Sequence, residues 1–105
     1  MRALLVALLV LTTSAATAAV KMECGGKITT VMAGHFSCEG YVAFKTEKSP
    51  SRWMCSKSKD ADSAILAGFM ADKKTTVQID GTDLTTQTCE GLNTYRKIDY
   101  IMLIK

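Results

Sequence analysis

Short stretches that alternate between apolar and polar residues predict strands along much of the chain. Residues 27–33 and 41–45 are rich in β-branched and aromatic side chains and are flanked by glycines, which is typical of strands. The segment 46–51 contains Pro50 and two serines, which predicts a turn. Residues 52–57 then resume an extended pattern. We therefore expect the second and third strands to form a hairpin.

The spacing of the apolar positions changes at residue 60, where a helical period begins and predicts a helix over residues 60–74. Asp60 or Asp62 is expected to cap its start, and two lysines at its end suit the negative end of a helix dipole. The residues that share the expected apolar face are Ala61, Ala64, Ile65, Gly68 and Phe69.

Two more strands are expected after the helix, at residues 75–80 and 98–104. The last one is apolar for most of its length, which predicts burial on both faces. A polar loop over residues 81–94 separates the two strands and is long for such a connection. The expected order is three strands, one helix and two strands.

The first 19 residues have the layout of a secretory signal peptide. One basic residue, Arg2, precedes an apolar run, and small residues follow it up to an Ala-x-Ala pattern that ends at Ala18. The apolar run is shorter than the roughly 20 residues that a membrane span needs. We expect cleavage after Ala18 or Ala19, which leaves residues 20–105 as one small secreted or periplasmic domain, with no membrane span.

The composition argues against several classes of function. The formal net charge is +3 and the basic residues are scattered, which disfavours nucleic-acid binding. The only histidine, His35, has no evident acidic or cysteine partner, and no serine lies in a nucleophile-elbow motif, so we expect no enzyme. The four cysteines lack the close spacing of zinc ligands, so we expect neither a metal nor a cofactor.

The cysteines are instead expected to form two disulfides, as a small exported domain requires. If the hairpin turns at residues 46–49, Cys38 faces Cys55 directly across the two strands, and cross-strand neighbours can be bridged. Cys24 and Cys89 then remain as the second pair. That bridge would join the start of the first strand to the loop before the last strand.

This order of elements is that of the OB-fold, a five-stranded Greek-key barrel. Its fourth strand runs antiparallel to its first, so a bridge from Cys24 to Cys89 fits the same topology. The sequence predicts a mainly β, OB-fold-like barrel with one helix and two disulfides.

A family resemblance supports this fold. The cysteine-bracketed segment 36–58, the alanine-rich helix that follows it and the strand through Val77 and Ile79 resemble the B subunits of subtilase-cytotoxin and pertussis-like AB5 toxins, and related small secreted bacterial proteins. The resemblance implies a glycan-binding subunit that forms a ring, often a pentamer, beside an enzymatic A subunit. The chain departs from these subunits in its shorter length and in lacking a tryptophan in the last loop.

Two regions carry residues suited to binding a sugar, which needs an aromatic face with fixed polar groups around it. Trp53 and the junction before the helix form one region, and the long loop forms the other. The alternatives are that Trp53 packs over the disulfide, that the junction only caps the helix, and that the loop is solvated. The candidate residues are Trp53, Ser56, Lys57, Ser58, Asp60, Thr85, Thr86, Gln87, Asn93 and Tyr95.

Two functions therefore remain open from the sequence. One is a secreted binding subunit that recognises a glycan or a partner protein. The other is a small secreted or periplasmic interaction or inhibitor protein of the same fold, without a glycan site.

Overall fold

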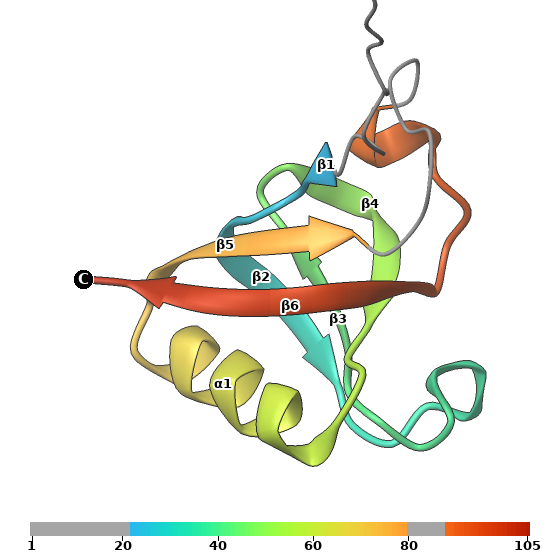
Figure 1. Ribbon diagram of the computed structural model, residues 1–105, viewed down its shortest axis with the longest axis horizontal. Helices are drawn as coiled ribbons and strands as arrows, with labels where there is room; N and C mark the ends of the chain where they lie inside the picture. The colour runs from blue at the N-terminus through green and yellow to red at the C-terminus, as the bar shows by residue number, and fades with distance from the viewer. Residues whose placement is uncertain (1–21, 80–87) are drawn as a thin grey trace, which may run out of the picture.

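A computed structural model gives the structure of the protein and describes residues 22–79 and 88–105 (Figure 1). The expected signal peptide lies outside the described residues, and so do three of the candidate loop residues, Thr85, Thr86 and Gln87. No helix in the described part of the chain is long and apolar enough to cross a membrane.

The described residues form a closed five-stranded β-barrel with one helix, in the strand order of an OB-fold. The strands follow one another around the barrel in the order β1-β5-β2-β3-β4-β6, and β5 also pairs with β6 and closes it. The β4–β6 pair is parallel and the other pairs are antiparallel. The expected fold class is confirmed. The bounds are β1 Met22–Glu23, β2 Gly26–Met32, β3 Ala43–Thr46, β4 Ser49–Cys55, β5 Lys74–Ile79 and β6 Arg96–Ile104.

β1 and β2 act as two halves of a single strand, which is why a barrel with six labelled strands is five-stranded. Both pair with β5 in one continuous register, in which Met22 faces Ile79 and Gly26 faces Thr75. Between them the chain stays so close to β5 that a Cβ atom on Gly25 would lie 2.2 Å from the Thr75 carbonyl oxygen. Glycine is therefore required where the strand is interrupted. The pattern of the sequence did not predict β1.

The helix α1, Lys59–Met70, lies against β2 and β6 (Figure 1). Its expected apolar face is confirmed, since Ile65 and Gly68 are buried. The predicted cap was wrong: Ser58 caps the helix by accepting a hydrogen bond of 3.1 Å from the Ala61 N–H. Asp62 instead accepts a hydrogen bond of 3.0 Å from the Val42 N–H, so it ties the helix to the segment before β3.

The helix also ends earlier than expected. Its last residue is Met70, and the chain reverses at Asp72, which has a positive φ of 55°. Lys73 and Lys74 therefore lie beyond the helix, and Lys74 is already the first residue of β5.

The core fills the barrel with side chains from every strand and from the helix. Phe44, Ile65, Ile79 and Ile98 are its largest fully buried side chains. A smaller cluster surrounds the Cys38–Cys55 disulfide and includes Ala43 with the partly buried Trp53. The two clusters account for the burial on which so small a domain depends.

The hairpin forms, but its predicted register was wrong. Cys55 faces Ala43 rather than Cys38, and Thr46 faces Ser49. Only two residues make the turn, because the serines and Pro50 belong to β4 rather than to a wider loop. The irregular pairing between Phe44 and Thr46 accounts for the remaining shift.

Both expected disulfides are nevertheless present. Cys24 and Cys89 are bridged with 5.7 Å between their Cα atoms, and Cys38 and Cys55 with 5.1 Å. Cys38 reaches its partner from a short 3-10 helix, Phe36–Cys38, that precedes β3. The pairing was right although the geometric reason for it was not.

The last strand is less buried than expected. Ile98 is buried, but Tyr100, Met102, Leu103 and Ile104 are exposed. The strand pairs with β4 only at its first two residues, and from there on it pairs with β5 alone. The second half of β6 therefore lies at the surface of the barrel.

Candidate functional site

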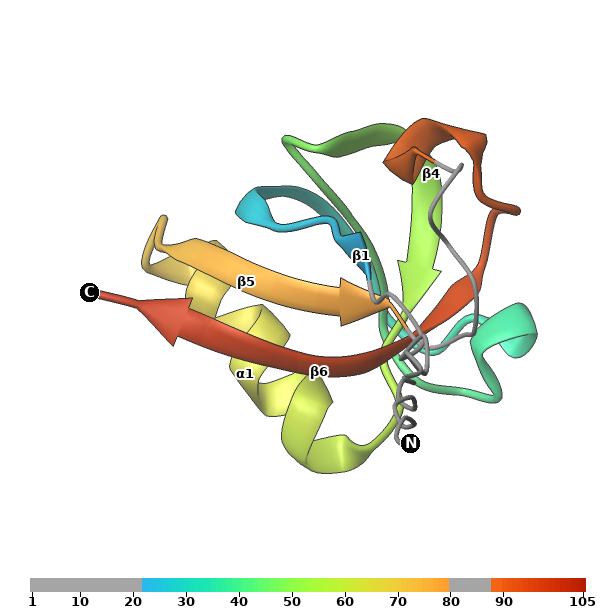
Figure 2. The same ribbon diagram turned by 45° about the horizontal axis from the view of Figure 1, so that its top comes forward.

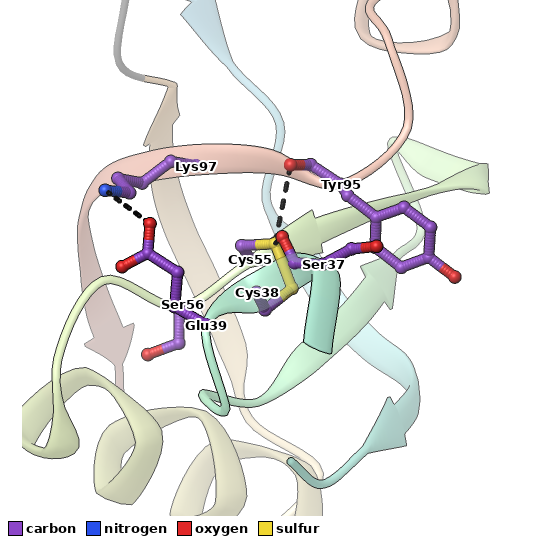
Figure 3. A pocket seen from close by; sticks show the side chains of 7 residues that line it. All are labelled: Ser37, Cys38, Glu39, Cys55, Ser56, Tyr95 and Lys97. Carbon is purple, nitrogen blue, oxygen red and sulfur yellow. Dashed lines mark hydrogen bonds and ion pairs between the residues drawn. A yellow bond between two sulfur atoms is a disulfide. The ribbon is translucent and has the colours of Figure 1, made fainter. Parts of the chain in front are cut away.

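A small hollow beside the Cys38–Cys55 disulfide is the candidate site, and we call it the Tyr95 pocket (Figure 3). It encloses about 180 Å³. Lys97 and Glu39 lie at one end, the Tyr95 ring lies at the other, and the disulfide lies between them. The residues that line it are Ser37, Cys38, Glu39, Cys55, Ser56, Tyr95 and Lys97.

The disulfide fixes one wall of this pocket. The short helix Phe36–Cys38 is capped by His35, whose Nδ1 accepts a hydrogen bond of 3.0 Å from the Ser37 N–H. The Tyr95 carbonyl oxygen lies 3.4 Å from the Cys55 sulfur (Figure 3). Three segments that are distant in sequence are thus held together at one covalent link.

Three aromatic rings stack beside the pocket. The His35 ring lies between the others, with its centroid 4.5 Å from that of Tyr95 and 4.9 Å from that of Phe36. Phe36 is 85% exposed, so most of its ring meets solvent. Stacking of this kind holds an aromatic ring in place without burying it. The result is an exposed aromatic surface made of stacked rings.

Two residues of the pocket have a strained backbone. Glu39 and Tyr95 adopt positive φ angles of 56° and 63°, a region that residues other than glycine rarely enter. Each such residue costs of order 1–3 kcal/mol, and such residues concentrate at functional sites. The part of the structure that is described has one other, Asp72, at the reversal after α1. Strain at two facing positions of one pocket therefore points to a functional role.

The charged groups of the pocket are loosely paired. Lys97 Nζ lies 4.0 Å from a Glu39 carboxylate oxygen, and the two side chains are 52% and 72% exposed. A solvent-exposed pair at this distance contributes little to stability. Both groups are therefore free to turn toward a ligand, one as a donor and the other as an acceptor.

Of the residues that the sequence suggested, Tyr95 and Ser56 line this pocket. The Ser56 side chain is 1% exposed, and its hydroxyl donates a hydrogen bond of 3.0 Å to the Ser58 carbonyl oxygen, so it shapes the turn before α1. Asn93 is exposed but does not line the pocket.

Lys57, Ser58 and Asp60 lie at a different hollow, of about 220 Å³, between the start of α1 and β6. Lys57 is 3.6 Å from the Asp99 carboxylate, and Ser58 caps the helix. These contacts give the junction a structural role. The structure thus separates the suggested residues into two places.

Trp53 does not offer an open face. It is partly buried in the cluster around the Cys38–Cys55 disulfide, and the Lys45 ammonium lies 4.5 Å from its ring centroid. A cation at that position occupies the face that a sugar would need. This supports the packing interpretation of Trp53.

The sequence interpretation missed Phe36, Ser37, Glu39 and Lys97. The available signal was the short segment around Cys38, in which an aromatic residue, a serine and an acidic residue precede Gly40. A predicted disulfide at Cys38 indicates that the turn around it has less conformational freedom. Lys97 had no comparable signal, because only the parallel β4–β6 pairing brings it near.

The described residues do not hold any group of three or more histidine, cysteine, aspartate or glutamate side chains suited to a metal ion. Within residues 22–79 and 88–105, two carboxylates have a shifted pKa, and neither lines the pocket. Partial burial raises the pKa of Glu23, but the Lys48 ammonium and two backbone N–H groups outweigh it, so the pKa lies below its usual value. At Glu90 the hydrogen bonds from Ser51 outweigh a similar effect and lower the pKa.

Comparisons with protein-family models, with curated proteins and with solved structures found no match for this chain. The fold and the site therefore define the protein as a class: a disulfide-linked OB-fold barrel with an aromatic pocket beside one disulfide.

Proposed function

We propose that this protein is a non-catalytic glycan-binding protein that works outside the cytoplasm, and that the Tyr95 pocket binds the sugar. Export is supported by the signal-peptide pattern and by both disulfides, because such bonds persist in oxidising compartments. The resemblance to the B subunits of AB5 toxins supports the ligand class, and it also suggests a ring assembly with an A-subunit-like partner.

The observation that carries the proposal is the backbone strain at Glu39 and Tyr95 on opposite sides of one pocket. Strain is retained where the surrounding structure holds it, and here a disulfide and a ring stack do so. A site fixed before the ligand arrives loses less conformational entropy on binding.

The chemistry of the pocket suits a sugar. A pyranose presents C–H bonds on its faces and hydroxyl groups around its rim. The Tyr95 ring in the pocket and the exposed Phe36 ring beside it offer surfaces for these faces, while Ser37, Glu39 and Lys97 supply donors and acceptors for the rim. The volume of about 180 Å³ lies below the ~300 Å³ at which pockets for drug-sized ligands begin, which fits a single sugar residue.

A glycan array tests this proposal. The purified protein is expected to bind a restricted set of glycans, and Tyr95→Ala and Phe36→Ala are each expected to lower binding about fivefold or more, since a stacked aromatic contributes about 1 kcal/mol or more. Met70→Ala is the control, because Met70 is 81% exposed on α1 and does not line the pocket. Circular dichroism confirms that each variant is folded.

A blank array for the purified protein contradicts the glycan proposal, and so does binding that Tyr95→Ala leaves unchanged. The alternative is an interaction or inhibitor protein without a glycan site. It draws support from Phe36, which at 85% exposure could insert into a partner protein. A blank array together with a partner whose binding Phe36→Ala abolishes would favour that alternative.

A further inference from the structure

The second half of β6 presents an apolar row on the outside of the barrel. Tyr100, Met102 and Ile104 alternate along the strand and are 43%, 51% and 44% exposed. Their paired neighbours on β5 are the polar residues Gln78, Thr76 and Lys74, so on this face β6 is apolar and β5 is not. Soluble barrels normally place polar side chains at such positions. This row therefore needs an explanation that the core does not supply.

The backbone edge beside this row is also unpaired by any strand. β4 pairs with β6 only at Arg96 and Lys97, and within the described ranges no other strand pairs with the edge that faces away from β5. The helix α1 meets Leu103 at Gly68, and its first turn shares a hollow with Tyr100 and Ile101. Figure 2 shows β6 passing in front of α1.

Native proteins usually protect such an edge with lysine, proline, a bulge or a covering element. The β5–β6 pairing has its one register shift beside Ile79, before Tyr100, and is regular from Tyr100 to Ile104. That regular stretch contains neither lysine nor proline. No strand of the described residues pairs with this edge beyond Lys97, and addition of a further strand to such an edge is a common mode of protein association.

We propose that two copies of this chain pair through this edge, with their β6 strands antiparallel about a two-fold axis at Met102. The two sheets then continue into each other, and each β6 fills the free hydrogen-bonding groups of the other. An interface of this kind uses the same surface on both copies, as most homodimers do. This pairing is an alternative to the ring assembly that the family resemblance suggests, and it does not depend on whether the Tyr95 pocket binds a glycan.

The register follows from charge complementarity. With Met102 facing its own copy, Tyr100 faces Ile104 and Ile101 faces Leu103, so that apolar side chains meet throughout the centre. At both ends Asp99 of one copy then faces Lys105 of the other. Opposite charges facing each other across strands are favourable, so both ends of the pairing are complementary.

Neighbouring registers lose this match. An axis at Ile101 would place Lys97 opposite Lys105 and Asp99 opposite Leu103, which combines like charges with a carboxylate against an apolar side chain. A shift by one residue also changes which side chains share a face. The sequence of the strand is complementary to itself in the register at Met102, which favours a second copy over an unrelated strand.

Size-exclusion chromatography with light scattering tests the pairing on the purified protein, over a range of concentrations. The expected mass is that of two chains. Met102→Lys places two like charges at the axis and is expected to weaken the dimer at least about tenfold. Met70→Lys is the matched control, because Met70 is 81% exposed on α1, and it should leave the mass unchanged.

Two further pairs of variants test the register and guard against misfolding. Lys105→Glu should weaken the dimer, whereas Lys105→Arg, which keeps the charge, should not. Met102→Cys should form covalent dimers under mild oxidation, whereas Met70→Cys should not, since the described cysteines are all paired. A mass of one chain at every concentration overturns the proposal, as does a five-chain ring. A dimer that Met102→Lys leaves intact and Met102→Cys fails to cross-link also overturns it.

Discussion

Glu23 shows how a single side chain stabilises the interrupted first strand. Its carboxylate accepts hydrogen bonds from the Gly25 N–H at 2.6 Å and the Val77 N–H at 3.2 Å, and it pairs with Lys48. Together these contacts hold the pKa of Glu23 below its usual value against the effect of partial burial. The side chain therefore joins β1, β5 and the β3–β4 turn.

Glu23→Gln is expected to lower the free energy of unfolding by about 1–2 kcal/mol at neutral pH, because hydrogen bonds to a charged group are lost. A depressed pKa in the folded state contributes stability above the unfolded pKa of about 4.3, and this is lost as the pH falls through the folded value. Urea unfolding at pH 7 and near pH 3 measures the difference. The control Glu39→Gln, which alters an exposed ion pair, should change the free energy of unfolding little. If Glu23→Gln lowered the free energy of unfolding equally at both pH values, this account would be contradicted.

Glu39 links strain to the proposed site. Glu39→Gly removes the side-chain penalty at φ 56° and is expected to raise stability by about 0.5–1 kcal/mol, while it removes an acceptor from the pocket and weakens glycan binding. Thermal unfolding gives the first quantity and array binding the second. Glu39→Ala is the control that removes the carboxylate but keeps the strain. A variant that is both more stable and fully active would show that the strain has no role in binding.

At the level of elements, α1 was well predicted as a helix and poorly predicted at both ends. The periodic apolar face that packs Ile65 and Gly68 into the core is a property of the sequence. The choice of Ser58 rather than an aspartate as the cap depends on tertiary contacts, because Asp62 is used to bind the backbone at Val42. Such competition is not visible in a linear pattern.

Ser58→Ala is expected to lower stability by about 1 kcal/mol through loss of this cap. Ser63→Ala is the matched control, since the exposed Ser63 hydroxyl donates only to the Lys59 carbonyl oxygen within the helix, and alanine favours a helix. Chemical denaturation of both variants provides the comparison. Equal losses would assign the helix start to a different residue.

The hairpin and the last strand mark the limit of prediction from pattern. Cysteine spacing suggested the right disulfides, but the register came from a two-residue turn and an irregular pairing that the spacing cannot express. β6 is apolar enough to be a core strand, yet half of it has no second partner strand in the described chain. Burial depends on what lies beside a strand, which is a property of the whole molecule.

At the scale of the molecule, the two disulfides have different roles. The chain-entropy model gives about 3 kcal/mol for the 17-residue separation of Cys38 and Cys55, and a little over 4 kcal/mol for the 65-residue separation of Cys24 and Cys89. The Cys24–Cys89 bridge joins the first strand to the segment before β6, and the Cys38–Cys55 bridge forms part of the Tyr95 pocket.

Paired serine substitution is expected to separate these roles. Replacing Cys24 and Cys89 should cost more stability, as measured by urea unfolding. Replacing Cys38 and Cys55 should cost less stability but abolish glycan binding at a temperature where the variant remains folded. If both double variants lose glycan binding only to the extent that they unfold, the Cys38–Cys55 disulfide does not shape a site.

The pocket itself was only partly predictable. Tyr95 was suggested by its loop, but the residues that face it come from the turn around Cys38 and from Lys97, which the barrel brings together across the chain. The same closure left Lys57 and Asp60 at a separate hollow. Sequence spacing groups neighbours along the chain, whereas the site is built from neighbours in the barrel.

The most direct test of the central claim is a two-dimensional NMR titration of the ¹⁵N-labelled protein with a panel of soluble mono- and disaccharides. Binding at the Tyr95 pocket predicts saturating shifts for the backbone amides of Ser37, Glu39, Tyr95 and Lys97, with little change at Lys57 and Asp60. The opposite distribution of shifts, or the absence of shifts with every sugar of the panel, would contradict the assignment of this pocket as a glycan site.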